Sequence, residues 1–128
     1  MPSDELRFAK THEWVQREGD LVRVGISDFA VKELTDLVYM ELPTVGREIA
    51  AGEGFGEVES VKAVSDLYAP VSGSITAVNS DLPGNLNWLS DDPYGKGWIM
   101  QVRLSDPGQL DALMSRDEYT KFCDSEKH

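Results

Sequence analysis

Cysteine, histidine and long apolar runs are scarce in this 128-residue chain, which has one cysteine and two histidines. The single thiol, Cys123, cannot form an internal disulfide and favours a reducing compartment. Two histidines without a cysteine cluster are too few ligands for zinc, so no metal is expected. No apolar stretch reaches the length of a membrane span, and the amino end resembles neither a signal peptide nor a transit peptide. We therefore expect a cytoplasmic protein with no membrane partner.

Basic residues are also scarce, and they form no run. Lys and Arg together number 12 against 23 Asp and Glu, so the formal net charge is -11. Nucleic acid would require a Lys/Arg footprint and is not expected as a partner. Protein partners should instead present basic surfaces. No nucleophile motif such as Gly-x-Ser-x-Gly occurs either, so the sequence suggests no catalytic residue.

Three glycines, Gly52, Gly54 and Gly56, have a spacing that partly matches a phosphate-binding loop. The final glycine of the dinucleotide motif is missing, and a strand-like run follows where the motif requires a helix. Glu53 and Glu57 would also repel phosphate. We interpret the three glycines as bend residues.

Short strand-like segments separated by turn residues fill most of the chain. The first two form a predicted hairpin, and Ser27 is a suitable N-cap for a short helix over 28–35. We treat the segment 81–90 as part of a longer loop. Strands are predicted over 11–17, 21–26, 38–42, 49–61, 63–67, 73–78 and 97–104.

The carboxyl end has helical rather than strand periodicity. Asp106 can cap one helix, and Ser115 with Glu118 reads as a capping box for a second helix that ends at about Cys123. We expect one antiparallel, mostly β domain over 1–128, with a core at about 6–104 and a helical tail at about 106–123. The strand pattern alone leaves a sandwich and a barrel equally open.

Lys62 interrupts an otherwise strand-like run between Gly56 and Ile75. Its neighbours Val61 and Ala63 are flanked by two strand-like segments, which predicts a hairpin with the lysine at its tip. Such a lysine is accessible to a modifying enzyme. Composition alone favours a solvated surface lysine, because most lysines are of that kind.

The motif around Lys62 changes this interpretation. The run ESVKAVSDLYAPVSG, residues 59–73, resembles the lipoylation hairpin of the glycine cleavage system H-protein family. Similar segments follow family order over roughly Leu6 to Phe122, and the chain departs from the family pattern mainly at 81–90. These segments are HEWV at 12–15, VGISD at 24–28, ELP at 41–43, DPYG at 92–95, GW at 97–98 and EYTKF at 118–122.

The resemblance implies a barrel-sandwich hybrid, the hammerhead fold of lipoyl- and biotinyl-carrier domains, with a short internal helix and a C-terminal helical tail added. It implies that (R)-lipoate is attached to Lys62 through an amide bond. The positions that would form the lipoylation context are Glu59, Ser60, Val61, Ala63 and Asp66. The positions that would line a cleft for the loaded arm are Thr11, Glu13 and Asp66.

By the same resemblance the chain would be a carrier rather than an enzyme. A pyridoxal-phosphate glycine decarboxylase (P protein) would load the arm with the aminomethyl group of glycine. A tetrahydrofolate-dependent aminomethyltransferase (T protein) would unload it, and dihydrolipoyl dehydrogenase (L protein) would reoxidise it. A lipoate ligase or transferase would attach the arm. We expect a monomer in the bacterial cytoplasm, with the mitochondrial matrix as the alternative if the chain is a processed organelle protein.

Other protein classes share parts of this pattern. A biotinyl domain is disfavoured because Val61 and Ala63 stand where biotin domains favour methionine. A lipoyl domain of a 2-oxoacid dehydrogenase usually belongs to a longer chain and lacks the helical tail. A lipoyl donor that relays the group to other carriers, and an interaction module whose lysine is never modified, also remain open. An intact-mass measurement would separate the modified classes from the unmodified one.

Overall fold

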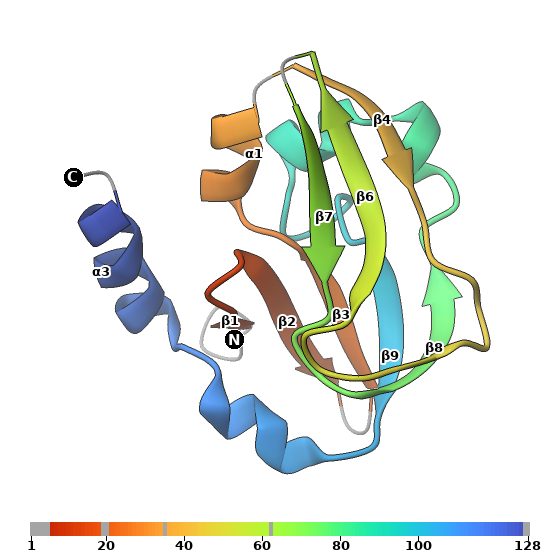
Figure 1. The fold of residues 1–128 in the computed structure, drawn as a ribbon, viewed down its shortest axis with the longest axis vertical. Coiled ribbons are helices and arrows are strands. Elements are labelled where there is room, and N and C mark those ends of the chain that lie inside the picture. Colours follow the sequence, from red (N-terminus) through yellow and green to blue (C-terminus); the bar gives the residue numbers. More distant parts are fainter. Residues whose placement is uncertain (1–5, 19–20, 35, 62, 127–128) are drawn as a thin grey trace.

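A computed structural model describes residues 6–18, 21–34, 36–61 and 63–126. Most of its regular structure is antiparallel strand, with short helices at the connections and at the carboxyl end (Figure 1). The elements in chain order are β1 (Leu6–Phe8), β2 (Glu13–Glu18), β3 (Leu21–Ile26), α1 (Asp28–Leu34), β4 (Leu37–Glu41), β5 (Glu48–Ile49), β6 (Gly54–Ser60), β7 (Val64–Tyr68), β8 (Gly73–Val78), η2 (Leu82–Gly84), α2 (Asn87–Asp91), β9 (Met100–Leu104), η3 (Pro107–Ala112) and α3 (Arg116–Glu126).

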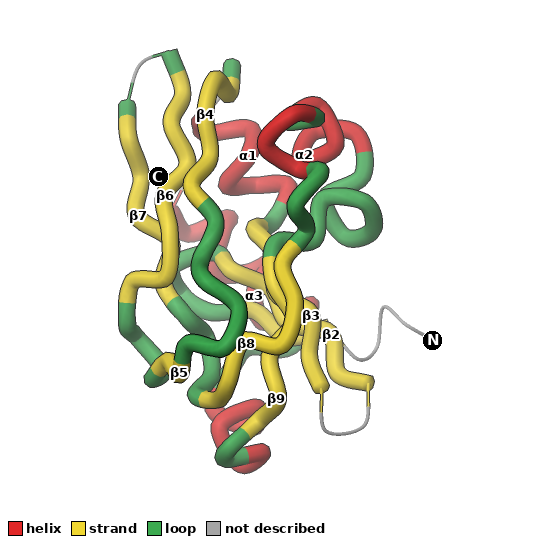
Figure 2. Tube along the Cα trace, turned by 90° about the vertical axis from the view of Figure 1, so that its right-hand side faces the viewer, coloured by secondary structure: helices red, strands yellow, loops and turns green. Residues whose placement is uncertain are grey.

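The strands form two sheets that pack face to face. The larger sheet has the order β1-β2-β3-β9-β8-β5, and the smaller has the order β4-β6-β7. Figure 2 shows the two sheets as layers, with β6 and β7 on one side and β2 and β3 on the other. Buried Val24 and Val102 from the larger sheet join Met40, Val58 and Leu67 from the smaller one in a single hydrophobic core. The mostly β, barrel-sandwich expectation is confirmed.

The amino-terminal hairpin and the helix after it are where the sequence predicts them. Glu13–Glu18 pairs with Leu21–Ile26, and the hydroxyl of Ser27 accepts a hydrogen bond from the N–H of Ala30 at 3.2 Å. This bond satisfies one of the free N–H groups at the start of α1. The strand Leu6–Phe8, which pairs with β2, was not predicted.

The predicted strand over 49–61 is wrong as a single element. Its first part, β5, pairs with β8 in the larger sheet, whereas β6 belongs to the smaller sheet. Gly52, at φ +88°, turns the chain between them, which confirms this glycine as a bend residue. Gly56 lies inside β6, where a Cβ would stand 2.4 Å from the carbonyl oxygen of Glu41. Close backbone approach rather than a bend therefore requires a glycine at position 56.

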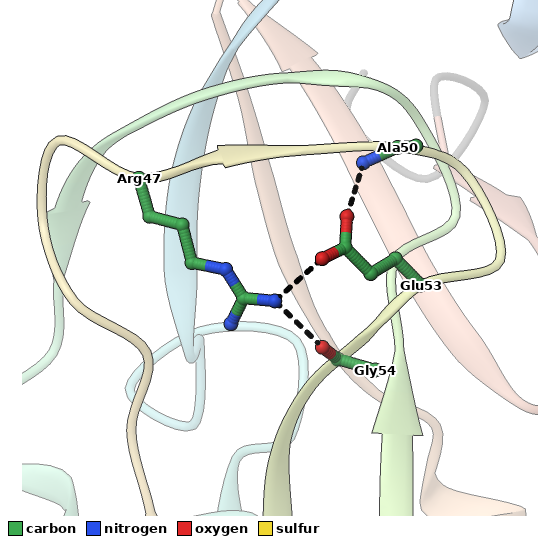
Figure 3. Close-up of polar contacts among 4 residues, drawn as sticks. All are labelled: Arg47, Ala50, Glu53 and Gly54. Carbon is green, nitrogen blue, oxygen red and sulfur yellow. Dashed lines mark hydrogen bonds and ion pairs between the residues drawn. The ribbon is translucent and has the colours of Figure 1, made fainter.

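An ion pair holds the turn between β5 and β6 closed. Arg47 Nη2 lies 2.7 Å from Glu53 Oε2 and donates to the carbonyl of Gly54 at 3.2 Å (Figure 3). The other carboxylate oxygen of Glu53 accepts the N–H of Ala50 at 2.9 Å. The Ala50 N–H and then Arg47 hold the pKa of Glu53 below its usual value. Glu53 is therefore a structural residue of this turn.

The segment treated as a loop contains two short helices. Both η2 and α2 lie within 81–91, and each presents a fully buried leucine, Leu82 or Leu89, to the core. Helices of three and five residues are too short to be predicted from periodicity, so packing decides whether they form. The last predicted strand also begins later than expected, at Met100, because turn hydrogen bonds occupy the chain up to Trp98.

The helical tail agrees with its predicted capping residues. Asp106 accepts the N–H of Gly108 at 3.1 Å, although the helix it caps is of the 3₁₀ type. Ser115 and Glu118 exchange reciprocal side-chain-to-backbone bonds at 2.9 and 3.2 Å, which confirms the capping box. The following helix, α3, runs past Cys123 to Glu126 and lies on the side of the molecule formed by β1 and α1 (Figure 1). Cys123 is buried there.

Candidate functional site

The predicted lysine hairpin is formed by β6 and β7, with Ser60 and Ala63 closing its end. The N–H of Ser60 donates to the carbonyl of Ala63 at 2.8 Å, and the Ser60 hydroxyl accepts the N–H of Ala63 at 3.2 Å. The N–H of Val61 donates to the carbonyl of Asp36 at 3.0 Å, so the end of the hairpin is anchored to the chain before β4. Lys62 itself lies outside the described residues. Its neighbour Val61 is 67% exposed, so the hairpin end faces solvent.

The outer face of the smaller sheet carries two rows of side chains near this end. In the first row Glu59 stands opposite Tyr39 on β4 and Val64 on β7. Both apolar neighbours are more than half exposed, at 52% and 56%. The second row consists of Glu41, Glu57 and Asp66. Exposed apolar and acidic groups therefore adjoin the hairpin end on one face.

Glu13 is the buried acid among the residues that the structure describes. It begins β2 and is 1% exposed. One carboxylate oxygen accepts a short hydrogen bond from the hydroxyl of Thr11, and the other accepts the N–H of Tyr68 at 3.0 Å. β7 is an edge strand of the smaller sheet, so this N–H points away from β6 and is free to meet the acid. Glu13 thus joins the two sheets at the end of β7 opposite the hairpin turn.

A cleft of about 360 Å³ opens beside Glu13. Its polar side carries Thr11, Glu13 and Asp66, the three residues that the family resemblance assigned to an arm cleft. Asp66 is exposed at the rim, whereas Glu13 lies at the buried side. The remaining wall residues are His12, Ile26, Phe29, Ala30, Val58, Ser65, Leu67 and Tyr68. The cleft therefore combines an apolar wall with a carboxylate that little water reaches.

Sequence reasoning missed three contributors to this cleft. The Tyr68 N–H could have been found, because alternation along an edge strand points every second backbone group away from the sheet. The apolar wall formed by Ile26 and Phe29 had no local signal, since it depends on how α1 packs over β3. His12 adopts φ +79°, which is uncommon for a residue with a Cβ, and the sequence gives no sign of it.

Burial raises the pKa of Glu13 from 4.5 to about 7, against the lowering effects of the Thr11 hydroxyl and the Tyr68 N–H. Desolvation is the largest cause of this change, and it raises the pKa because burial disfavours the charged carboxylate. A cation that enters the cleft would favour the ionised form of Glu13. The site is therefore suited to a ligand that brings its own positive charge, such as an ammonium group.

Glu13→Gln should stabilise the unmodified protein at alkaline pH. The folded-state pKa of Glu13 lies above its unfolded value, so its favourable contribution is complete below about 4.5 and is lost as pH rises through about 7. A neutral amide escapes this loss while keeping an acceptor for Tyr68. We expect the free energy of unfolding in urea to rise by about 1–3 kcal/mol at pH 8.5 and to change little at pH 4. Glu48→Gln, at an exposed site, is the matched control. An equal change at both pH values in Glu13→Gln would contradict the assignment.

The described part of the chain offers neither a metal site nor a membrane-spanning helix. No group of three or more His, Cys, Asp or Glu side chains there could hold a metal ion. None of the helices in the described ranges has both the length and the apolar character that crossing a bilayer requires.

The two packed sheets and the exposed hairpin define a barrel-sandwich domain of the lipoyl- and biotinyl-carrier class. A sequence profile of the family described as Glycine cleavage H-protein matches residues 6–126. The chain belongs to this family.

Individual relatives agree with the profile. A glycine cleavage system H protein of Halalkalibacterium halodurans is 51% identical over 123 residues, which is 96% of each chain. One from Mycobacterium avium is 54% identical over 112 residues, covering 87% of this chain and 85% of that protein. The crystal structure of a glycine cleavage system H protein from Mycobacterium marinum superposes with a TM-score of 0.84 at 41% identity, covering 94% of this chain and 97% of that one.

Proposed function

We propose that this chain carries (R)-lipoate on Lys62 and moves the aminomethyl group of glycine between the enzymes of the glycine cleavage system. The lipoyl-carrier role in that system follows from its family membership. The attachment site is supported by one observation in particular. The hairpin end, where Val61 and Ala63 are exposed, continues along β7 to the buried carboxylate of Glu13. A lysine at this hairpin end would therefore have a binding site along the same strand.

The residues present fit a lipoyl arm. When bound, lipoate would supply a disulfide that is reduced as it accepts the aminomethyl group, and oxidation of the resulting dithiol would re-form it. The chain itself has no catalytic role in this proposal. It presents the lysine to each enzyme in turn, and attachment to a docked protein raises the effective concentration of the reacting group.

The cleft beside Glu13 holds the arm between these visits. The Glu13 carboxylate accepts charge-assisted hydrogen bonds from the aminomethyl ammonium, and the Thr11 hydroxyl orients that carboxylate. Asp66 adds negative charge at the rim. The apolar wall excludes water, and this slows hydrolysis of the transported group.

Each partner would dock around the hairpin end. These partners are glycine decarboxylase, aminomethyltransferase, dihydrolipoyl dehydrogenase and the lipoate ligase or transferase. The face formed by Tyr39, Val61 and Val64 offers apolar contact, and the neighbouring acids suit a basic partner surface. The bond between Ser60 and Ala63 keeps the turn closed while a partner enzyme binds it.

Glu59→Ala should slow lipoylation more than it destabilises the fold. Glu59 stands opposite Val64 beside the modified turn, and removing a partly exposed surface acid costs about 0–1 kcal/mol. The rate of lipoyl transfer by a lipoate ligase should fall severalfold, measured by intact mass against time. Glu48→Ala, an exposed acid on β5, is the matched control. Lipoylation of Glu59→Ala at the unaltered rate would contradict a docking role.

We further propose that the chain is a single domain and a monomer that acts in the bacterial cytoplasm. The relatives named above are bacterial proteins, which supports this location. A lipoyl domain of a 2-oxoacid dehydrogenase, a lipoyl relay protein and an unmodified interaction module are the competing functions.

The test is expression with lipoate, intact-mass analysis and reconstitution with purified partners. We expect one added lipoyl group and exchange of the glycine carboxyl group with bicarbonate when glycine decarboxylase is supplied. An unmodified mass would favour an interaction module. A lipoylated protein that does not support glycine exchange but is acted on by a 2-oxoacid dehydrogenase would favour the dehydrogenase class. Transfer of its lipoyl group to another carrier would favour a relay protein.

A further inference from the structure

A residue of the C-terminal helix contacts the two segments that flank the cleft. Tyr119, on α3, is buried, and its hydroxyl lies 2.7 Å from Nδ1 of His12 and 2.5 Å from the hydroxyl of Ser27. These partners lie 107 and 92 residues away along the chain. Figure 1 shows α3 on the side of the molecule where β1 and α1 lie. The tyrosine thus links the helical tail to the amino-terminal third of the chain.

Each contact leads to one wall of the cleft. His12 precedes Glu13 and follows Thr11, and its carbonyl accepts the N–H of Ser27 at 2.9 Å. Ser27 in turn caps α1 through Ala30, which lines the cleft beside Phe29. Movement of His12 would therefore displace the Thr11–Glu13 wall, and movement of Ser27 would displace the α1 wall.

His12 needs support from outside its own segment. Its φ of +79° lies in the left-handed region, which is unfavourable for a residue with a Cβ. Within the turn its N–H donates to the carbonyl of Ala9 at 2.9 Å. The Tyr119 hydroxyl supplies a side-chain partner, and the Phe29 and Phe122 rings lie near the imidazole at 5.0 and 5.9 Å between centroids.

The hydroxyl of Tyr119 is not needed for packing. The ring stacks on Phe8 with centroids 4.3 Å apart and an interplanar angle of 7°. A phenylalanine would make the same stacking contact without burying a polar group. Burial raises the pKa of Tyr119 above its ordinary value, so the phenol stays neutral and acts through hydrogen bonds.

We propose that Tyr119 is a positioning residue of the arm cleft, and that through His12 and Ser27 it holds the two walls that keep water from Glu13. This inference rests on the proposed function of the cleft. It makes the C-terminal helix part of the carrier's protective site rather than a cover for the sheet edge.

The first test uses the unmodified protein and so does not depend on the arm. Carboxyl carbon NMR of Glu13 is followed with pH in the parent protein, in Tyr119→Phe and in Tyr94→Phe. Tyr94 is the matched control because its hydroxyl donates to Asp28, the first residue of α1, at 2.9 Å, and its ring also contacts Phe8. We expect the pKa of Glu13 to fall from about 7 toward 4.5 in Tyr119→Phe only, because water reaches the carboxylate.

The groups that titrate near Glu13 are distinguished in the same experiment. His12 from the preceding turn and Asp66 and Tyr68 from β7 line the cleft, whereas β3 and α1 contribute the apolar Ile26, Phe29 and Ala30. The resonances of His12 and Asp66 are therefore followed together with that of Glu13. An altered titration of His12 alone would be a direct effect of losing its Tyr119 contact and would overturn the positioning role.

The second test measures protection of the transported group. Lipoylated parent and variants are loaded with glycine and glycine decarboxylase, freed of the enzyme, and followed for release of ammonia. We expect release from Tyr119→Phe to be about threefold to tenfold faster, the effect of one ordinary hydrogen bond. Docking should be unaffected, so the KM for the carrier in the decarboxylase reaction should stay unchanged.

If Tyr119→Phe does not fold, substitutions of its two partners test the same hydrogen bonds from the other side. His12→Asn removes the imidazole but introduces asparagine, which tolerates the left-handed conformation. Ser27→Gly removes the hydroxyl but keeps a residue that is accepted at the start of a helix. Ser27→Gly should shift the Glu13 pKa downward, and His12→Asn should shift it less. An unchanged Glu13 pKa and unchanged release in a folded Tyr119 variant, or equal changes in Tyr94→Phe, would overturn the inference. A parent protein that gains no lipoyl group would instead count against the proposed function and leave the NMR result valid.

Discussion

Lys62→Arg should carry no lipoyl group at all, although it folds like the parent protein. Arginine keeps the positive charge and most of the volume, but its guanidinium stays protonated and cannot be acylated by a ligase. Bonds between Ser60 and Ala63 close the hairpin, and the substitution leaves both residues in place, so the hairpin should survive. Intact mass after expression with lipoate measures the result directly.

An exposed lysine elsewhere in the chain provides the control for this experiment. Lys96 lies over the ring of Trp88 at 6.0 Å in a turn that has no hairpin context. Lys96→Arg should be lipoylated as fully as the parent protein. Lipoyl mass retained on Lys62→Arg, or lost from Lys96→Arg, would place the modification elsewhere.

Glu13→Ala should release the transported group about tenfold to a hundredfold faster than the parent protein. A hydrogen bond to a charged group contributes about 1.5–3 kcal/mol, and the ammonium in the cleft would lose its buried acceptor. The variant should still accept lipoate, because Glu13 lies at the other end of β7 from the modified turn. Ammonia release after removal of the decarboxylase is the measurement.

Asp66→Ala is the comparison within the same cleft. Asp66 is exposed at the rim, where solvent screens its charge, so its loss should accelerate release less than the loss of Glu13. Equal rates in the parent protein and in both variants would show that this cleft does not protect the group.

The effect of Glu13 should depend on pH in a direction set by its raised pKa. Only the ionised carboxylate pairs with an ammonium, and below about 7 the empty cleft must first release a proton. Protection of the parent protein relative to Glu13→Gln should therefore weaken as pH falls from 8 to 6. The ratio of the two release rates removes the pH dependence of the chemistry itself. A ratio that is constant over this range would contradict the raised pKa.

Local signals predicted the elements that local hydrogen bonds complete. Ser27 caps α1 and Ser115 caps α3 through bonds that span three residues, so the capping residues can be read directly from the sequence. The hairpin around Lys62 has the same local character. The run over 49–61 misled because its two halves pair in different sheets, and strand pairing is a long-range property. The buried leucines of η2 and α2 were missed for a similar reason.

The resemblance to the family proposed Glu13 and Asp66 as cleft acids. The sequence by itself determined the family, the mostly β fold and the hairpin formed by β6 and β7. It did so because these features are encoded in runs of adjacent residues. The tertiary structure decided what Glu13 can do. The pKa of Glu13 depends on burial between two sheets and on the N–H of Tyr68, which lies 55 residues away on the edge strand β7. The contacts of Tyr119 with His12 and Ser27 were decided in the same way, because a side chain acquires its solvent exposure and its distant partners only when the chain folds.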